Sequence, residues 1–149
     1  MKNIDCSKFL AMSPEELRKK QWTNGLPLSI VGIFVYIALV LTGHKPKDYM
    51  GICPYFEVGK GWGGFEMGWF FVCGKDTGTK TKNHEIGHMI QNATVGGFKM
   101  LAYSVVSMAR YWWSQIATLK TPYYSWFFEK DASRIGDEYV KNITEKQEK

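Results

Sequence analysis

The stretch KNHEIGHMIQ, residues 82–91, contains the pattern His-Glu-x-x-His. Two of the chain's three histidines, His84 and His88, lie here one helical turn apart. On a helix they share one face with Gln91, so both imidazoles can reach a single metal ion. Glu85 lies beside them, where it can take a proton from water that a bound Zn²⁺ has made more acidic. The pattern therefore predicts a zinc-hydrolase helix with Glu85 as the general base.

Capping residues mark the ends of this predicted helix. Thr81 or Asn83 can cap its start, and Gly96-Gly97 can end it. The alternative to a zinc site is an ordinary helix whose histidines only make polar contacts.

A catalytic zinc needs a third protein ligand besides two histidines. A third histidine six residues after the second is absent, because Thr94 stands at that position. Further along the chain, Thr121-Pro122 is a strong helix start, and the helix that follows carries Glu129. We expect Glu129 to be the third ligand.

The neighbours of Glu129 support this expectation. Glu129 shares a helix face with Ala132 and Gly136, at positions i, i+3 and i+7. These small residues let the helix approach the motif helix closely, which brings the carboxylate within reach of the metal. Asp131 and Glu138 point roughly 180–200° away around the helix, at about 100° per residue, so neither can replace it. The alternative is that Glu129 is a solvent-facing charge.

An uncharged run extends from Gln21 to Gly43. Its apolar centre, residues 26–42, would be about 26 Å long as a helix, close to the width of the hydrocarbon core of a bilayer. Trp22 lies at one end as an interface anchor, and basic residues lie beyond both ends. We expect residues 26–43 to form a transmembrane helix; the alternative is a buried core helix.

The segments around this run complete the expected organisation. Residues 1–25 form an amphipathic lead-in, whose helix starts at the capping box Ser13-Pro14-Glu15-Glu16. The basic cluster Arg18-Lys19-Lys20 favours a single-pass protein with a cytoplasmic N-terminus. Residues 44–143 form the domain that carries the motif, and residues 144–149 form a polar tail.

The stretch 51–74 is rich in glycine between aromatic and β-branched residues. Residues 56–58 and 65–72 are typical of strands, around a turn at Gly59-Lys60-Gly61. Glycine in a strand marks a bulge or the close approach of another backbone, as a bound peptide would make. We therefore expect a small β-sheet or hairpin beside the two site helices.

The stretch 96–119 lies between these two helices. It is apolar, but Lys99 and Arg110 interrupt it too closely for a second membrane span. It predicts either an interfacial helix, with the aromatic run 111–113 at headgroup depth, or an amphipathic core helix.

Composition narrows the function classes. A chain of 149 residues makes one domain, and a net charge of +5 from scattered Lys and Arg disfavours nucleic-acid binding. The aromatic content of 15% fits a membrane-interface protein or a dense small core. Cys6, Cys53 and Cys73 show no Cys-x-x-Cys pairing, which argues against a thiolate zinc site. Cys53 and Cys73 either form one disulfide or remain unpaired thiols.

Together these motifs resemble the gluzincins, the branch of the zincin metallopeptidases with a glutamate ligand. The resemblance is carried by HEIGH at 84–88 and EKDAS at 129–133. It extends to short bacterial membrane-associated proteins with a Gly-Gly-Phe strand, a His-Glu-x-Gly-His-x-x-Gln helix and an aromatic-rich Glu-x-x-Ala helix. Here those elements are GGFEMGWFFV, HEIGHMIQ and YYSWFFEKDASRIG, and the resemblance covers about residues 62–137.

The resemblance implies that His84, His88 and Glu129 bind zinc and that Glu85 is the general base. Similar proteins usually have an acid after the alanine, which orients a ligand histidine; this chain has Ser133 there. The residues that could orient a ligand or supply an oxyanion donor are Gln91, Asp131, Ser133, Tyr123, Tyr124 and Arg110.

The sequence therefore predicts a membrane-anchored zinc metallopeptidase. The expected fold is α+β and mostly helical, with one N-terminal transmembrane helix before a minimal zincin-like domain. The expected partners are a peptide or protein substrate and a lipid bilayer, with no nucleic acid. The alternative is a small non-catalytic membrane protein that binds zinc structurally, or not at all, and acts through a protein partner.

Overall fold

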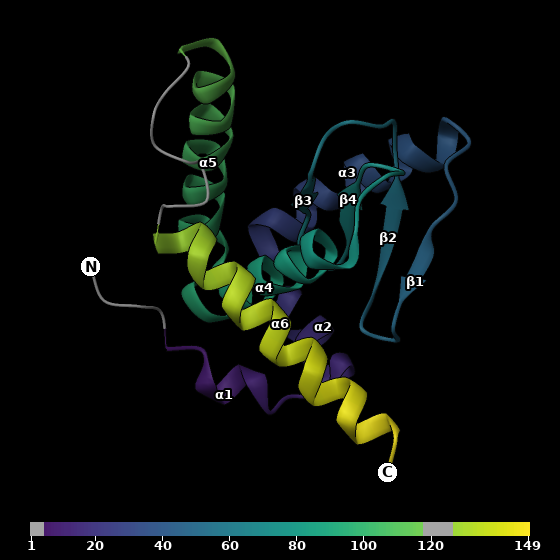
Figure 1. Ribbon diagram of the computed structural model, residues 1–149, viewed down its shortest axis with the longest axis vertical. Coiled ribbons are helices and arrows are strands. Elements are labelled where there is room, and N and C mark those ends of the chain that lie inside the picture. Colours follow the sequence, from purple (N-terminus) through teal and green to yellow (C-terminus); the bar gives the residue numbers. More distant parts are fainter. Residues whose placement is uncertain (1–4, 118–126) are drawn as a thin grey trace.

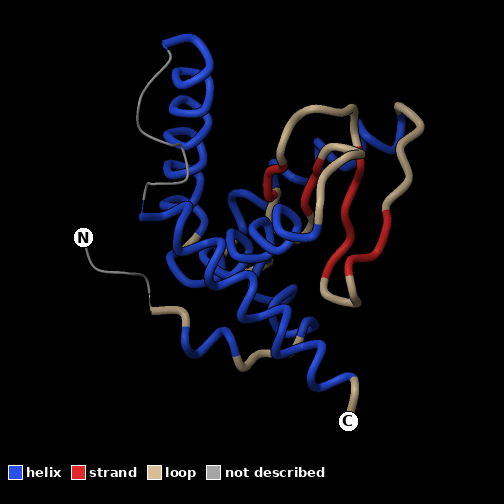
Figure 2. Tube along the Cα trace, in the orientation of Figure 1, coloured by secondary structure: helices blue, strands red, loops and turns tan. Residues whose placement is uncertain are grey.

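The computed structural model describes residues 5–117 and 127–149, which form a mostly helical α+β fold (Figures 1 and 2). The helices in these ranges are α1 (Ser7–Leu10), α2 (Pro14–Gln21), α3 (Leu26–Leu41), α4 (Thr79–Val95), α5 (Gly97–Ala117) and α6 (Phe127–Gln147). The strands are β1 (Lys47–Tyr49), β2 (Cys53–Glu57), β3 (Gly64–Glu66) and β4 (Phe71–Cys73).

The four strands form one mixed sheet in the order β1-β2-β4-β3. β1 and β3 are antiparallel to their neighbours, and β2 is parallel to β4. The single strand predicted over 65–72 is wrong, because this stretch forms two strands joined by a turn. Gly68 adopts a φ of 81° in that turn, and the N–H of Met67 donates to the carbonyl of Phe70 at 2.9 Å. β3 therefore lies at the edge of the sheet and does not pair with β2.

Side chains of the sheet alternate between its two faces. Phe71 and Cys73 of β4 lie in the main core with residues of α2, α4 and α6. Val72, between them, lies in a second cluster with Phe56, against which Tyr36 of α3 packs. The sheet is thus covered by α3 on one face and α4 on the other. α6 packs on the far side of α4 (Figure 1).

α4 and α6 approach each other closely because small residues meet where they cross. Gly87 of α4 faces Ala132 of α6, and Gly136 of α6 faces Asn83 of α4. A Cβ added at either glycine would overlap a backbone carbonyl oxygen of the other helix. Only glycine fits at these two positions, and the contact brings the first turn of α6 against the middle of α4.

The transmembrane helix predicted for residues 26–43 is wrong. Within the described residues, no single helix is long and apolar enough to cross a membrane. α3 has 16 residues, about 24 Å, whereas the hydrocarbon core of a bilayer is about 30 Å thick. The chain bends by 93° between α2 and α3. One side of α3 also belongs to the protein core, since Gly32 is buried against the backbone of Met67.

The predicted N-terminal helix is present as α2, and it packs against the core. The capping box forms as expected, because Ser13 and Glu16 each accept a hydrogen bond from the backbone N–H of the other. Leu17 is fully buried. Arg18 donates to the carbonyl oxygen of Ile52 at 2.7 Å, which ties α2 to the loop between β1 and β2.

Candidate metal centre

α4 carries the His-Glu-x-x-His pattern in its middle. The helix starts at Thr79, slightly earlier than predicted, and ends where Gly96 adopts a φ of 87°. Nε2 of His84 and Nε2 of His88 lie 3.0 Å and 3.2 Å from the same oxygen, Oε2 of Glu129 in the first turn of α6. The two Nε2 atoms are 3.1 Å apart. The structure thus brings together three residues that could hold a metal ion.

Gln91 orients the imidazole of His88. Its amide nitrogen donates to the carbonyl oxygen of Phe128 at 2.9 Å, so its amide oxygen faces Nδ1 of His88 at 2.8 Å. Because this oxygen can only accept, Nδ1 carries a proton. Nε2 of neutral His88 therefore presents a lone pair toward Glu129.

Ser133 orients the imidazole of His84 in the same way. Its hydroxyl donates to the carbonyl oxygen of Glu129 at 3.3 Å, so its oxygen accepts from Nδ1 of His84 at 2.8 Å. Nε2 of neutral His84 then also presents a lone pair. Ser133 lies where the resemblance would place an orienting acid, and its hydroxyl makes the contact.

Two imidazole lone pairs and one carboxylate oxygen therefore converge within 3.0–3.2 Å of one another. Acceptors this close repel one another unless a cation lies among them. Ligand atoms about 2.0–2.1 Å from a zinc ion, at tetrahedral angles, are about 3.3–3.4 Å apart. The observed separations of 3.0–3.2 Å are slightly shorter than that spacing, so a small outward shift of the side chains would admit the ion. Two nitrogens and one oxygen suit zinc, and three protein ligands leave a position open.

The convergence also sets the pKa values of the three groups. In the metal-free chain, burial alone would raise the pKa of Glu129, but its contacts with Nε2 of His84 and of His88, one of which then carries a proton, hold it well below its usual range. Burial lowers the pKa of His84. Burial opposes the charge of His88 as well, but Glu129 outweighs it and raises the pKa of His88 to about 9. In the metal-free chain, a proton on His88 supplies the positive charge that the cluster needs.

Glu85 lies between α4 and the edge strand β3. It is 2% exposed, and its Oε2 has no hydrogen-bond partner within the described residues. Gly64 of β3 leaves room for it, since a Cβ there would lie 3.0 Å from Oε1 of Glu85. Burial raises the pKa of Glu85 to about 7, although nearby His88 opposes the shift. A buried carboxylate with this pKa, and with one oxygen that makes no hydrogen bond within the described residues, is suited to accept a proton at neutral pH.

A second buried carboxylate, Glu66, lies on β3. It accepts from the N–H of Gly68 at 2.6 Å and from the amide of Asn92 at 3.3 Å. Asn92 also donates to the side chain of Gln21 at 2.7 Å, so this network joins the edge strand to α4 and α2. Burial raises the pKa of Glu66 to about 8, and the charge of Glu85 adds to the shift. A lone acid within the apolar stretch GGFEMGWFF was the available sequence clue.

Ser107 of α5 is another site residue that the sequence analysis does not identify. It is buried and donates to Oε1 of Glu129, the oxygen that does not face the histidines. No local motif marks this serine, because the contact depends on how α5 and α6 meet. The hydroxyl of Ser107 gives Oε1 of Glu129 a hydrogen-bond donor and so holds Oε2 in its direction toward the histidines.

The other predicted site residues lie elsewhere. Asp131 is buried but is not part of the cluster, and its Oδ2 has no partner within the described residues. Arg110 is exposed on α5. Tyr123 and Tyr124, and the predicted helix start at 121–122, lie outside the described residues.

The three cysteines take no part in the cluster. Cys6, Cys53 and Cys73 are buried and free. Of the two alternatives for Cys53 and Cys73, the structure therefore agrees with unpaired thiols. Burial raises the pKa of each thiol, to about 11 for Cys73, which keeps all three neutral.

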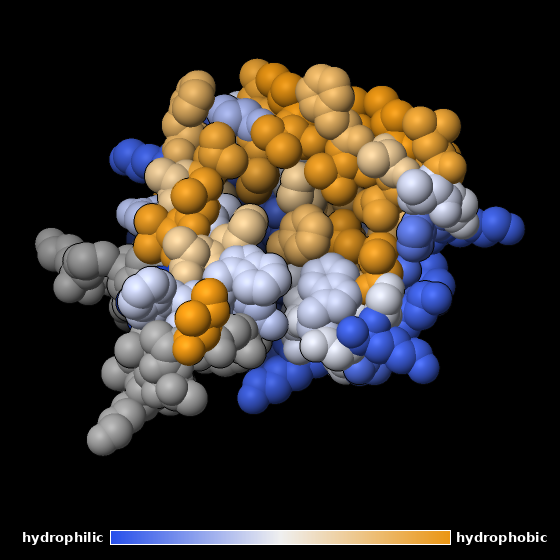
Figure 3. Space-filling view, turned by 90° about the horizontal axis from the view of Figure 1, so that it is seen from above, coloured by the Kyte–Doolittle hydropathy of each residue, from blue (hydrophilic) through white to orange (hydrophobic). Residues whose placement is uncertain are grey.

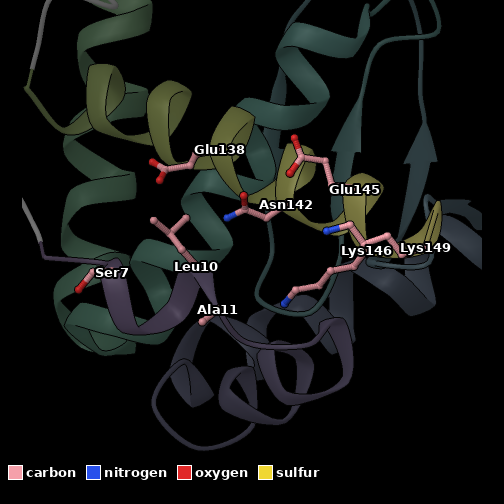
Figure 4. Close-up of a pocket in the computed structure, with 8 residues that line it drawn as sticks. All are labelled: Ser7, Leu10, Ala11, Glu138, Asn142, Glu145, Lys146 and Lys149. Atoms are coloured by element: carbon pink, nitrogen blue, oxygen red, sulfur yellow. The ribbon is translucent and has the colours of Figure 1, made fainter.

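A hollow between α1 and the second half of α6 lies outside the candidate site (Figure 4). Its lining consists of Ser7, Leu10, Ala11, Glu138, Asn142, Glu145, Lys146 and Lys149. None of the cluster residues contributes to it, and its acidic and basic side chains are mixed.

No protein-family model, curated protein or solved structure matches this chain. The geometry of the cluster and of the groups around it is therefore the basis for inferring a function.

Proposed function

We propose that this chain is a gluzincin-type zinc metallopeptidase, with His84, His88 and Glu129 as ligands and Glu85 as general base. The observation that carries the proposal is the convergence of two imidazole Nε2 atoms and one carboxylate oxygen within 3.0–3.2 Å. The three side chains come from two helices that meet at glycines, and Gln91 and Ser133 fix the histidine tautomers.

The chemistry divides between the metal and Glu85. Bound Zn²⁺ would act as a Lewis acid that polarises the scissile carbonyl and makes water acidic near neutral pH. Glu85 takes the proton of the attacking water on Oε2, which has no hydrogen-bond partner within the described residues, and gives it to the amine that leaves. Its buried position beside the two histidine ligands suits both transfers.

The edge strand supports a peptide as the substrate class. In the part of the chain that the structure describes, β3 pairs with β4 alone, so its other side offers backbone donors and acceptors. Gly64 of this strand lies against Glu85. A peptide that extends the sheet along β3 would therefore pass the general base.

The test compares wild type with Glu85→Gln. The amide keeps the shape but cannot act as a base, and residue 85 is not a ligand in this proposal. We expect the variant to keep its zinc and to lose cleavage of fluorescein-labelled casein and of a synthetic peptide mixture read by mass spectrometry. Glu145→Gln, on the exposed part of α6, is the control and should cleave normally.

Two outcomes would overturn the assignment of Glu85: loss of zinc from Glu85→Gln, or cleavage at the wild-type rate. Bound zinc without cleavage by any of the three proteins would favour the non-catalytic alternative.

A further inference from the structure

Exposed apolar side chains gather on two helices. Within the described residues, 18 large apolar side chains are exposed, and eight of these lie on α3 and seven on α5. The most exposed are Phe34 and Leu41 of α3 and Phe98 and Ile116 of α5, at 71–82%. We call this surface, formed by the outward sides of α3 and α5, the α3/α5 face. Figure 3 shows hydrophobic residues covering much of one face of the molecule, with hydrophilic residues toward its margin.

The two helices belong to one surface because they pack against each other. Leu28 of α3 and Met100 of α5 lie in the same buried cluster, and Gly97 at the start of α5 lies against Pro27. The inward sides of both helices are therefore occupied by the fold. An exposed apolar surface of this extent is typical of an interaction site.

The charges around the face identify its partner. Residues 17–47 and 97–117, which contain both helices, carry seven of the 19 Lys and Arg residues and none of the 14 Asp and Glu residues. The rest of the chain carries 12 basic and 14 acidic residues, so the net positive charge lies in these segments. Two of their seven cations, Lys19 and Lys47, pair with Glu15 and Glu57 outside the ranges, which leaves a net positive surface. Docking of a second copy through the same face would bring two basic surfaces together, which is unfavourable. An anionic surface is complementary.

We propose that the α3/α5 face docks on the surface of an anionic lipid bilayer, with both helices lying along the interface. Aliphatic residues on one side of a helix, lysines beside them and tryptophans at the rim are the pattern of interfacial helices. Trp22, Trp112 and Trp113 are the exposed tryptophans of these segments. Basic residues near such a surface are attracted to anionic lipid.

This docking places the candidate metal centre next to the bilayer. Val106 and Met108 are exposed on the face, while Ser107 between them is buried and donates to Glu129. The same turn of α5 therefore contacts the candidate centre on one side and the lipid on the other.

Vesicle flotation with the full chain tests the proposal. We expect the chain to float with vesicles of phosphatidylcholine and phosphatidylglycerol, to float less with phosphatidylcholine alone, and to detach as salt is raised. The double variant Phe34→Ser/Leu41→Ser should bind the mixed vesicles about tenfold or more weakly, because two exposed apolar side chains no longer enter the interface. Lys20→Ser/Lys45→Ser should bind the vesicles that contain phosphatidylglycerol more weakly than wild type does. Its binding to vesicles of phosphatidylcholine alone should not change.

Met50→Asn is the matched control. It removes an exposed apolar side chain outside the face, and asparagine tolerates the φ of 55° there. Circular dichroism shows whether each variant keeps its helices. Equal flotation of wild type and Phe34→Ser/Leu41→Ser would overturn the proposal. So would a lipid-free dimer that this double variant dissociates. Neither readout uses hydrolysis, so the result is independent of the proposed function.

Discussion

The hydroxyl oxygen of Ser133 lies 2.8 Å from Nδ1 of His84. Ser133 follows Glu129 by one helical turn on α6. α6 therefore supplies both the third candidate ligand and the group that orients the first. A serine can make this contact because the glycine contacts hold the two helices so close together. A neutral hydroxyl accepts the Nδ1 proton less strongly than a carboxylate would.

The first prediction concerns this contact. Ser133→Ala should weaken zinc binding about tenfold or more, because the imidazole of His84 loses its orienting acceptor. Ser133→Asp should bind zinc at least as tightly as wild type. Competition with a fluorescent zinc chelator measures both affinities, and Ser104→Ala on α5 serves as the control. Unchanged affinity in Ser133→Ala would show that the hydroxyl does not orient the ligand.

The second prediction concerns the helix contact. Gly136→Ala should lower the free energy of unfolding by about 1–3 kcal/mol, because the added Cβ overlaps the carbonyl oxygen of Asn83. The direction of the change in unfolding free energy is informative, because the same substitution inside an exposed helix stabilises a protein by about 1 kcal/mol. Urea unfolding gives the values. Gly63→Ala, where a Cβ meets no atom within 4 Å, should change stability little. A stabilised Gly136→Ala would mean that the helices are further apart than described.

The third prediction concerns pH and Glu66. The pKa of this carboxyl is about 8 in the folded chain, against 4.5 for the ordinary group, so the folded state binds the proton more tightly. Its stabilising contribution is complete below about pH 4.5 and is lost as the pH rises to about 8. Glu66→Gln removes this titration.

Urea unfolding of both proteins in a chelator, at several pH values from 5 to 8, tests this prediction. The difference in unfolding free energy, variant minus wild type, should rise with pH by at most about 1.4 kcal/mol per pH unit. The chelator removes the pH dependence that metal binding would add. A difference that stays constant from pH 5 to 8 would mean that Glu66 is ionised throughout in the folded chain.

The parts of the site that follow from the sequence are the local ones. The four-residue spacing of His84 and His88 defines one helix face, and the small residues at Ala132 and Gly136 predict a close helix contact. Ser107 and Glu66 meet the site only through the packing of elements that are distant in the chain. No local pattern encodes such contacts.

The error on α3 has a physical origin. Hydropathy counts apolar residues but does not show whether they face lipid or the protein's own sheet. Tyr36 and Leu39 of α3 pack against the cluster that includes Phe56, while Phe34 and Leu41 remain exposed. An all-round apolar helix that covers a sheet with one side therefore has the composition of a membrane span.

The central claim is that Glu129 completes a zinc site with the two histidines. Elemental analysis of the purified proteins, after equilibration with zinc and removal of the excess, tests it most directly. The proposed site predicts about one zinc per chain in wild type and in Glu138→Ala, whose side chain is exposed on α6. Zinc should be lost from Glu129→Ala as readily as from His88→Ala. Equal zinc content in wild type and Glu129→Ala would contradict the claim.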